Sequence, residues 1–235
     1  ESITFTTSDS EDETSYLFYD DFEKDGNIPG MAPLGWTIRG EIQKVPVEPV
    51  NGDFSSFILE EGNNKFQRLA ITGGRNYLNL ISQVPFTEQL KDIMVFEGKM
   101  RAHSTENFTH VMRVTGSKSR VNIVNMNTVG KVSIIHGDNP TASLETNFFY
   151  EKDKWHDFKT VIYVRDGLWQ TFMDNTPLTP YPIPLFDIGF NDPMKLFDFN
   201  LGCLTEGGTT TLDVDDAKIY SLDPATIEQS VPANN

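Results

Sequence analysis

Short stretches in which apolar and polar residues alternate recur along this chain, with turn residues between them. The clearest is 95–103, where every second residue from Phe96 to Ala102 is apolar or glycine and the residues from Glu97 to His103 between them are charged or histidine. A period of two is typical of a strand with one buried face. Such stretches follow one another at about 8–12 residues, and no segment shows a helical period of useful length. The pattern predicts an all-β chain folded as a two-sheet antiparallel β-sandwich.

The predicted domain organisation is simple. Residues 1–15 are polar and acidic, with little to bury, which favours a disordered leader or linker. Residues 16–222 contain no internal repeat and no linker, so we expect a single β-sandwich domain there, followed by a tail at 223–235. A chain of 235 residues is long enough to bury a substantial core in one such domain.

Composition excludes several classes of function. The chain has 19 basic and 34 acidic residues, a net charge of −15, whereas nucleic-acid binding needs a basic face. Cys203 is the only cysteine, which excludes an intrachain disulfide and paired cysteine ligands for zinc. No apolar run approaches the roughly 20 residues of a transmembrane segment.

Three motifs mark the beginning, middle and end of the predicted domain. The first is Asp20-Asp-Phe-Glu23 followed by Gly35-Trp36, and the second runs from Trp155-His-Asp-Phe-Lys159 through Asp166-Gly167 to Asn175. The third, 215–220, ends a strand at 209–220 that carries three acids, although acids are depleted in strands. Together, in this order, they resemble the concanavalin A-like lectin and glucanase superfamily over most of the chain.

This resemblance implies a jelly-roll fold and a polysaccharide or other glycan as the ligand. It also implies a bacterial protein that is extracellular, attached to the cell surface or periplasmic, with its targeting segment outside the sequence given. Many such domains carry a structural calcium ion that joins the first strand to the last. Glu23 and Asp215 are the matching acids here, and Asp53 follows a glycine in a loop that could add a ligand. The alternative is that the acids of 209–220 are solvated residues that discourage edge pairing.

Catalysis is less well supported than the fold. Glycosidases that resemble this chain use a Glu-x-Asp-x-(x)-Glu strand, whose acids share one face and cleave the glycosidic bond. No such set of acids occurs in the sequence, so we do not expect a glycosidase of that kind.

A polysaccharide lyase is the enzymatic alternative, with a divergent glycoside hydrolase beside it. Arg101 and His103 lie two residues apart and share a strand face, and Tyr163 lies on the polar face of its own strand. These residue types neutralise a uronate and serve as base and acid in lyases. The simpler interpretation is that all three are ordinary solvent-facing residues.

Sugar binding requires aromatic rings that stack on pyranoses and polar groups that fix hydroxyls. Trp169, Trp155 and Tyr181 are the aromatic candidates, and Asn125 is the polar candidate on a strand unusually rich in asparagine. We therefore expect a non-catalytic carbohydrate-binding jelly-roll module. The lyase or hydrolase remains an alternative, as does a structural or adhesive module that binds protein.

Overall fold

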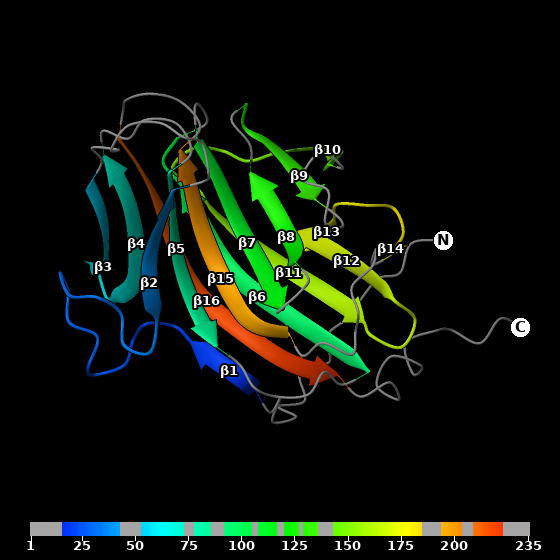
Figure 1. Ribbon diagram of the computed structural model, residues 1–235, viewed down its shortest axis with the longest axis horizontal. Coiled ribbons are helices and arrows are strands. Elements are labelled where there is room, and N and C mark those ends of the chain that lie inside the picture. The colour runs from blue at the N-terminus through cyan, green and yellow to red at the C-terminus, as the bar shows by residue number, and fades with distance from the viewer. Residues whose placement is uncertain are drawn as a thin grey trace, which may run out of the picture.

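The computed structural model describes residues 16–42, 53–72, 78–85, 92–104, 108–116, 120–126, 129–135, 143–184, 194–203 and 209–222 (Figure 1). Within these ranges the chain forms strands and no helix, arranged in two sheets whose paired strands all run antiparallel. The predicted all-β sandwich is thereby confirmed. The predicted leader at 1–15 and tail at 223–235 lie outside the described residues. No helix in the described part is long and apolar enough to cross a membrane.

Sheet A has the strand order β13-β12-β11-β6-β16-β4-β3, with β1 paired to β16 and β14 to β12. Sheet B has the order β10-β9-β8-β7-β15-β5-β2. The strands of sheet A are β1 (Tyr16–Asp20), β3 (Asp53–Glu61), β4 (Asn64–Thr72), β6 (Ile93–Ala102), β11 (Trp155–Tyr163), β12 (Leu168–Met173), β13 (Thr176–Pro177), β14 (Ile183–Pro184) and β16 (Thr209–Leu222). Those of sheet B are β2 (Thr37–Ile42), β5 (Leu78–Pro85), β7 (Phe108–Gly116), β8 (Arg120–Met126), β9 (Lys131–Ile135), β10 (Ser143–Phe149) and β15 (Met194–Cys203).

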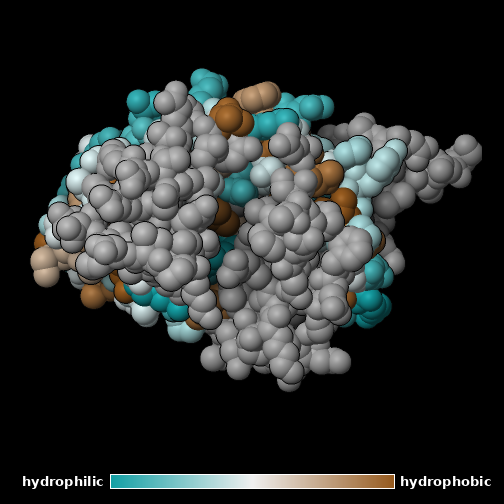
Figure 2. All heavy atoms as spheres, turned by 45° about the horizontal axis from the view of Figure 1, so that its top comes forward, coloured by the Kyte–Doolittle hydropathy of each residue, from teal (hydrophilic) through white to brown (hydrophobic). Residues whose placement is uncertain are grey.

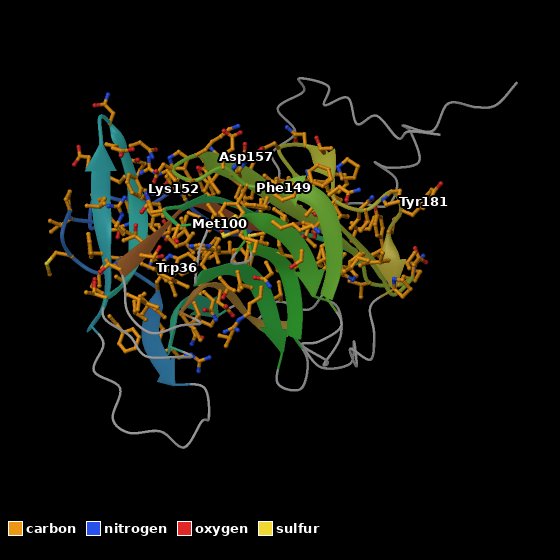
Figure 3. All side chains as sticks on the ribbon, turned by 90° about the horizontal axis from the view of Figure 1, so that it is seen from above. Trp36, Met100, Phe149, Lys152, Asp157 and Tyr181 are labelled. Atoms are coloured by element: carbon orange, nitrogen blue, oxygen red, sulfur yellow. The ribbon has the colours of Figure 1, made fainter. Side chains whose placement is uncertain are left out.

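One hydrophobic cluster draws residues from both sheets. Phe96 of β6 meets Phe197 of β15, with ring centroids 5.9 Å apart. Gly98, the one residue without a side chain on the inner face of β6, lies under Phe199, because a Cβ atom there would stand 2.7 Å from the Phe199 ring. Trp36 and Met100 lie in the interior between the two layers of strands (Figure 3). The inward residues of 95–103 are therefore those that the alternation predicts.

The opening motif is part of this core. The buried carboxylate of Asp20 accepts hydrogen bonds from the Trp36 indole (2.9 Å) and from the Phe22 backbone N–H (2.9 Å). Phe22 has a positive φ of 59°, and its ring packs against Trp36 with centroids 5.7 Å apart. Strand β1 then pairs with β16, so that Asp20 lies opposite Ala217 (Figure 1). The first and last motifs of the sequence therefore meet in one sheet.

The middle motif forms the β11–β12 hairpin, with Phe158 opposite Met173 and Tyr163 opposite Leu168. Gly167 in its turn has a φ of 63°, the left-handed conformation that glycine adopts readily. Asn175 also has a φ of 63°, and asparagine is among the few other residues that tolerate this region. The hairpin predicted at Asp166-Gly167 is present.

Candidate functional site

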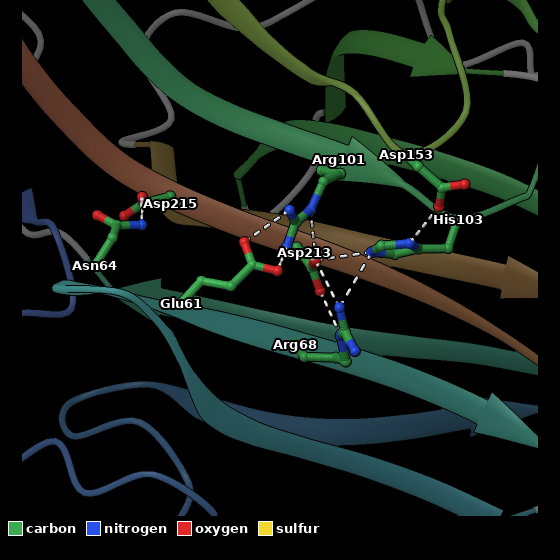
Figure 4. Close-up of polar contacts among 8 residues, drawn as sticks. All are labelled: Glu61, Asn64, Arg68, Arg101, His103, Asp153, Asp213 and Asp215. Atoms are coloured by element: carbon green, nitrogen blue, oxygen red, sulfur yellow. Dashed lines mark hydrogen bonds and ion pairs between the residues drawn. The ribbon is translucent and has the colours of Figure 1, made fainter.

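Side chains that alternate with the core residues lie on the outward faces of the two sheets, and both faces carry buried charge. On sheet A the charge gathers around Asp213 of β16 (Figure 4). We call the Asp213 cluster the set formed by Asp213 with Glu61, Arg68, Arg101, His103 and Asp153.

Asp213 is fully buried and has hydrogen-bond partners on two strands, namely β4 and β6 with the residue just after it. Arg68 reaches it through Nε (2.6 Å to Oδ1) and Nη2 (2.9 Å to Oδ2), and Arg101 through Nε (2.8 Å to Oδ2). His103 Nε2 lies 2.7 Å from Oδ2. Burial opposes ionisation, yet the hydrogen bonds from Arg68 and His103 hold the pKa of Asp213 below its usual value. Asp213 is therefore the anionic centre of the cluster.

The cations around Asp213 have further partners. Arg101 is bonded to both carboxylate oxygens of Glu61 (2.9 and 3.2 Å), and its guanidinium carbon lies 4.7 Å from the centre of the Trp155 ring. His103 Nδ1 lies 2.6 Å from Asp153. The hydrogen bond to Asp213 is the main cause of the raised pKa of His103, which favours its charged form. The cluster is a network in which each cation contacts at least one carboxylate.

The lyase set is not assembled. Arg101 and His103 do come together, through Asp213, as their shared strand face predicts. Tyr163 does not lie with them. Arg101 lies opposite Trp155 at the start of β11, whereas Tyr163 lies opposite Ile93 at the other end of that strand. Eight residues of strand separate the two positions by about 25 Å. The sequence shows which face a residue occupies but not how far along the sheet it lies.

The predicted calcium ligands are only partly brought together. Glu23 Oε1 accepts a hydrogen bond from the Lys65 backbone N–H (2.5 Å), and the side chain of the neighbouring Asn64 donates one to Asp215 Oδ2 (3.1 Å). Asp53 begins β3 opposite Thr72, at the far end of the β3–β4 hairpin from Asn64 and thus about 25 Å away. Asp53 therefore does not belong to this set.

The remaining pair of acids has one property that suits a cation. Asp215 is almost fully buried, and burial raises its pKa to about 6. The hydrogen-bond donors that reach it are neutral, namely the Asn64 amide and the Asp216 backbone N–H. No group of three or more histidines, cysteines or acids within the described ranges is arranged to hold a metal ion. Glu23 and Asp215 would thus need backbone carbonyls or water to complete a calcium shell of six to eight oxygens.

The predicted sugar-binding residues are scattered over the molecule. Trp169 is only 1% exposed, because β12 turns it inward beside Thr171 and Met173, so its predicted stacking role is wrong. Trp155 lies half-buried beneath Arg101 on the outward face of sheet A. Tyr181 is 73% exposed and lies at the edge of the molecule (Figure 3). These three aromatic residues do not form one binding surface.

Asn125 lies on a second outward face, that of sheet B. Strand β15 buries Phe197, Phe199 and Leu201 in the core, so the alternating Asp198 and Asn200 point away from it. By the same alternation β5 presents Gln83, β7 presents Arg113, β8 presents Asn125 and β9 presents Ser133. We call this set of six residues the sheet B polar face: Gln83, Arg113, Asn125, Ser133, Asp198 and Asn200.

The strand register arranges these side chains in two rows. In the first, Asp198 lies between Gln83 on β5 and Arg113 on β7. In the second, Asn200 and Asn125 both lie opposite Val111, and Asn125 lies opposite Ser133. Polar groups therefore cross the middle of sheet B on the side away from the core.

The sheet B polar face differs from the Asp213 cluster in its hydrogen bonding. Arg113 Nε and Asp198 Oδ1 form an ion pair at 2.5 Å, with side chains 8% and 1% exposed. The amide oxygens of Gln83, Asn125 and Asn200 are buried, and none of them has a hydrogen-bond partner in the described part of the chain. A buried polar atom without a partner costs roughly 1–3 kcal/mol. Such oxygens are suited to meet donors from a ligand or from water.

Strand β8 contains a spacing that the search for acids missed. Arg120, Asn122 and Asn125 stand at the intervals of Glu-x-Asp-x-x-Glu. The pairing with β9 shifts register between Asn122 and Asn125, which returns Asn125 to the face of Asn122. Asn122 lies opposite Arg113, next to the polar face. The sequence could have pointed to this strand through the spacing alone, since an arginine and two amides stand in place of the three carboxylates.

Comparison with solved structures gives the fold. Rv0315, described as an immunostimulatory antigen and pseudo beta-1,3-glucanase of Mycobacterium tuberculosis, matches 88% of this chain and 99% of its own, with a TM-score of 0.61 at 14% identity. A GH16 protein of the Bacteroides ovatus mixed-linkage glucan locus, in complex with a G4G4G3G product, matches 86% and 99%, with a TM-score of 0.58 at 13% identity. Cellulose induced protein Cip1 matches 87% and 97%, with a TM-score of 0.56 at 13% identity.

One neighbour is much longer than this chain. A sialidase matches 88% of the chain with a TM-score of 0.58 at 12% identity, but the chain covers only 19% of that protein. No family model matches the sequence, and no curated protein matches it either. The two antiparallel sheets and these neighbours confirm the predicted fold: the chain is a two-sheet jelly-roll β-sandwich, similar in fold to the pseudo-glucanase and the GH16 protein.

Proposed function

We propose that this protein is a carbohydrate-binding jelly-roll module without catalytic activity and that the sheet B polar face holds the glycan. The observation that carries the proposal is the set of buried amide oxygens on Gln83, Asn125 and Asn200 that lack partners among the described residues. Sugar hydroxyls donate and accept hydrogen bonds, and so do side-chain amides, which makes the two chemically matched. Gln83 and Asn125 are half-buried, so part of each side chain faces solvent although the oxygens themselves are enclosed.

The absence of catalysis rests on strand β8. Glycoside hydrolysis needs two carboxyl groups placed on either side of the scissile bond. The strand has Arg120, Asn122 and Asn125 at the spacing of the catalytic acids, and none of these can act as nucleophile or general acid. Asp198 is the one carboxylate of the polar face, and it is paired with Arg113. Fold neighbours include one described as a pseudo-glucanase and one with a bound product, so this fold is compatible with either outcome.

The coloured part of the face in Figure 2 gives no particular support to a protein-binding module. On the face shown in Figure 2, the described residues are mainly hydrophilic, and hydrophobic atoms occur in small separate groups. Protein-docking surfaces usually contain a contiguous apolar patch.

We propose an extracellular, cell-surface or periplasmic location in a bacterium, where polysaccharides are encountered. The supporting observation is the similarity of fold to glucanases and to a cellulose-induced protein.

We also propose that a calcium ion stabilises the module, held by Glu23 and Asp215 near the start of β4. Its support is the buried carboxyl group of Asp215, which has only neutral hydrogen-bond donors. The role would be to join the segment after β1 to β16 and to cancel charge on Asp215, away from the sheet B polar face.

The test measures binding and product release on the same samples. Purified protein is titrated with soluble polysaccharides in a calorimeter, and each mixture is then assayed for new reducing and unsaturated ends. We expect saturable binding without products, and a loss of affinity of about fivefold or more for Asn125→Ala, the equivalent of one hydrogen bond. Asp157→Ala, an exposed residue on the outward face of sheet A, is the matched control and should bind normally. Release of products, or equal binding by both variants, would contradict the proposal.

A further inference from the structure

We infer that the sheet B polar face selects an uncharged stretch of glycan and that Asp198 determines this selectivity by neutralising Arg113. The inference rests on the proposed function, because it concerns the ligand of the same face.

The first step is the position of the ion pair. Asp198 lies near the middle of β15, with β7 on one side and β5 on the other, and Arg113 is its direct neighbour on β7. Both side chains are more than nine-tenths buried, and Nε lies 2.5 Å from Oδ1. Of the described side chains that β5, β7 and β15 present on this face, these two are the charged ones. The centre of the face therefore contains one cation and one anion in contact.

The second step is what a ligand meets above this pair. A contacting cation and anion largely cancel each other at a distance, so this pair offers no net charge to a carboxylate or sulfate group. An arginine that recognises an anionic sugar would need its guanidinium group free to form charge-assisted bonds with the ligand. Here the guanidinium group of Arg113 is already in an ion pair, with its Nε atom 2.5 Å from Asp198 Oδ1. The middle of the sheet B polar face is thus suited to neutral groups.

The third step is whether the unpaired atoms on this face accept or donate hydrogen bonds. The atoms without partners on Gln83, Asn125 and Asn200 are all oxygens, which accept and cannot donate. A sugar hydroxyl has an O–H to give to each of them. An ionised carboxylate or sulfate has only acceptor atoms and would face these oxygens with no proton between them. Hydrogen bonding and charge therefore favour the same class of ligand, a neutral hydroxyl-rich glycan.

The experiment compares neutral polymers (laminarin, mixed-linkage glucan and galactomannan) with uronate polymers (alginate and polygalacturonate). We expect the wild-type protein to bind at least one neutral polymer and to prefer it over both uronates. Its affinity should change by less than about twofold between about 20 mM and 500 mM salt, because no net charge is involved. Preference for a uronate, or a steep loss of affinity with salt, would overturn the inference. Binding to none of the polymers would contradict the proposed function itself.

Asp198→Asn tests the residue directly. It leaves Arg113 without its anion, and we expect the ratio of uronate to neutral affinity to rise by about tenfold or more, with strong salt dependence. An unchanged ratio in the folded variant would contradict the inference. Because a lone buried charge can prevent folding, the double variant Arg113→Met/Asp198→Leu is made in parallel, since replacing both members of a buried pair is tolerated far better. The double variant also has no net charge at these two positions, so it should bind neutral polymers more tightly than uronates. Tighter binding of uronates would contradict the inference.

Discussion

The Asp213 cluster and the sheet B polar face both bury charged and polar side chains on the outside of a β-sheet, but they differ in how fully those groups are paired. In the cluster, Asp213 receives hydrogen bonds from Arg68 and Arg101 and contacts His103, and two of these cations hold second carboxylates (Figure 4). On the polar face, amide oxygens are buried without partners in the described part. A completed network contributes to stability, whereas an incomplete one reduces stability and is available to a ligand. From this difference we propose a structural role for the Asp213 cluster and a binding role for the sheet B polar face.

The largest expected effect is on stability, at the cluster. Asp213→Asn removes the anion that Arg68, Arg101 and His103 share, and leaves buried cations uncompensated. We expect the free energy of unfolding to fall by about 3–5 kcal/mol, the usual cost of breaking a buried ion pair from one side. Urea denaturation measures it, with the exposed Asp157→Asn on the same sheet as control. A loss below about 1 kcal/mol would show that the cluster is not a stabilising network.

The opposite result is expected on the polar face. Asn200→Ala removes a side chain whose oxygen has no partner among the residues that the structure describes, so the free energy of unfolding should change by less than about 1 kcal/mol. Affinity for a bound polysaccharide should fall by about fivefold or more. Denaturation and calorimetry on one preparation give both values. A strongly destabilised variant that binds normally would remove the distinction between the two regions.

Calcium should act on stability and not on binding. If Glu23 and Asp215 hold the ion, millimolar calcium raises the melting temperature relative to chelator, and Asp215→Asn reduces that rise. In the absence of calcium, the pKa of Asp215 is raised from 3.8 to about 6, so its buried carboxyl group destabilises the fold as pH rises between these two values. Asp215→Asn should therefore gain stability relative to wild type at pH 7 but not at pH 4. Identical melting curves with calcium and with chelator would exclude the metal.

A smaller pH effect is expected at His103. Its pKa is raised by the hydrogen bond to Asp213, so the stability it adds is fully present below its ordinary pKa of about 6.5. That stability is lost as pH rises through the raised value. The difference in unfolding free energy between wild type and His103→Gln should be at most about 1 kcal/mol near pH 5.5, since the site is partly exposed, and should shrink at high pH. A difference that grows with pH would show that the charged histidine does not stabilise the cluster.

The smallest effect is expected at Tyr181. This side chain is 73% exposed and belongs to neither region, so Tyr181→Ala should change stability by less than about 0.5 kcal/mol and leave glycan affinity unaltered. A clear loss of affinity would instead support the stacking role predicted for Tyr181 and would place the ligand away from sheet B.

The sequence predicted the fold well because period-two alternation and turn residues are local signals. Phe96 and Met100 lie inward as their spacing indicates, and the Asp166-Gly167 turn is where the motif places it. Trp169 was misassigned because both faces of β12 contain apolar residues, so alternation does not tell which face is buried. Tyr163 was misassigned because register along the sheet is not encoded within one strand.

The candidate site was harder to predict because it depends on pairing between strands that are distant in the sequence. Arg113 and Asp198 meet only because β7 and β15 are neighbours in sheet B. Asn125 was selected for the asparagine content of its strand, but its relation to Asn200 could not be seen without the sheet order. The spacing of Arg120, Asn122 and Asn125 was present in the sequence and was missed because only acids were sought.

The most direct test measures affinity for a neutral polysaccharide and unfolding free energy together, for wild type, Asp213→Asn and Asn200→Ala. The account predicts that Asp213→Asn loses stability and, while folded, binds as wild type does. It predicts that Asn200→Ala keeps its stability and loses binding. If Asp213→Asn instead abolished binding while folded, and Asn200→Ala bound normally, the ligand would lie on sheet A and the central claim would be wrong.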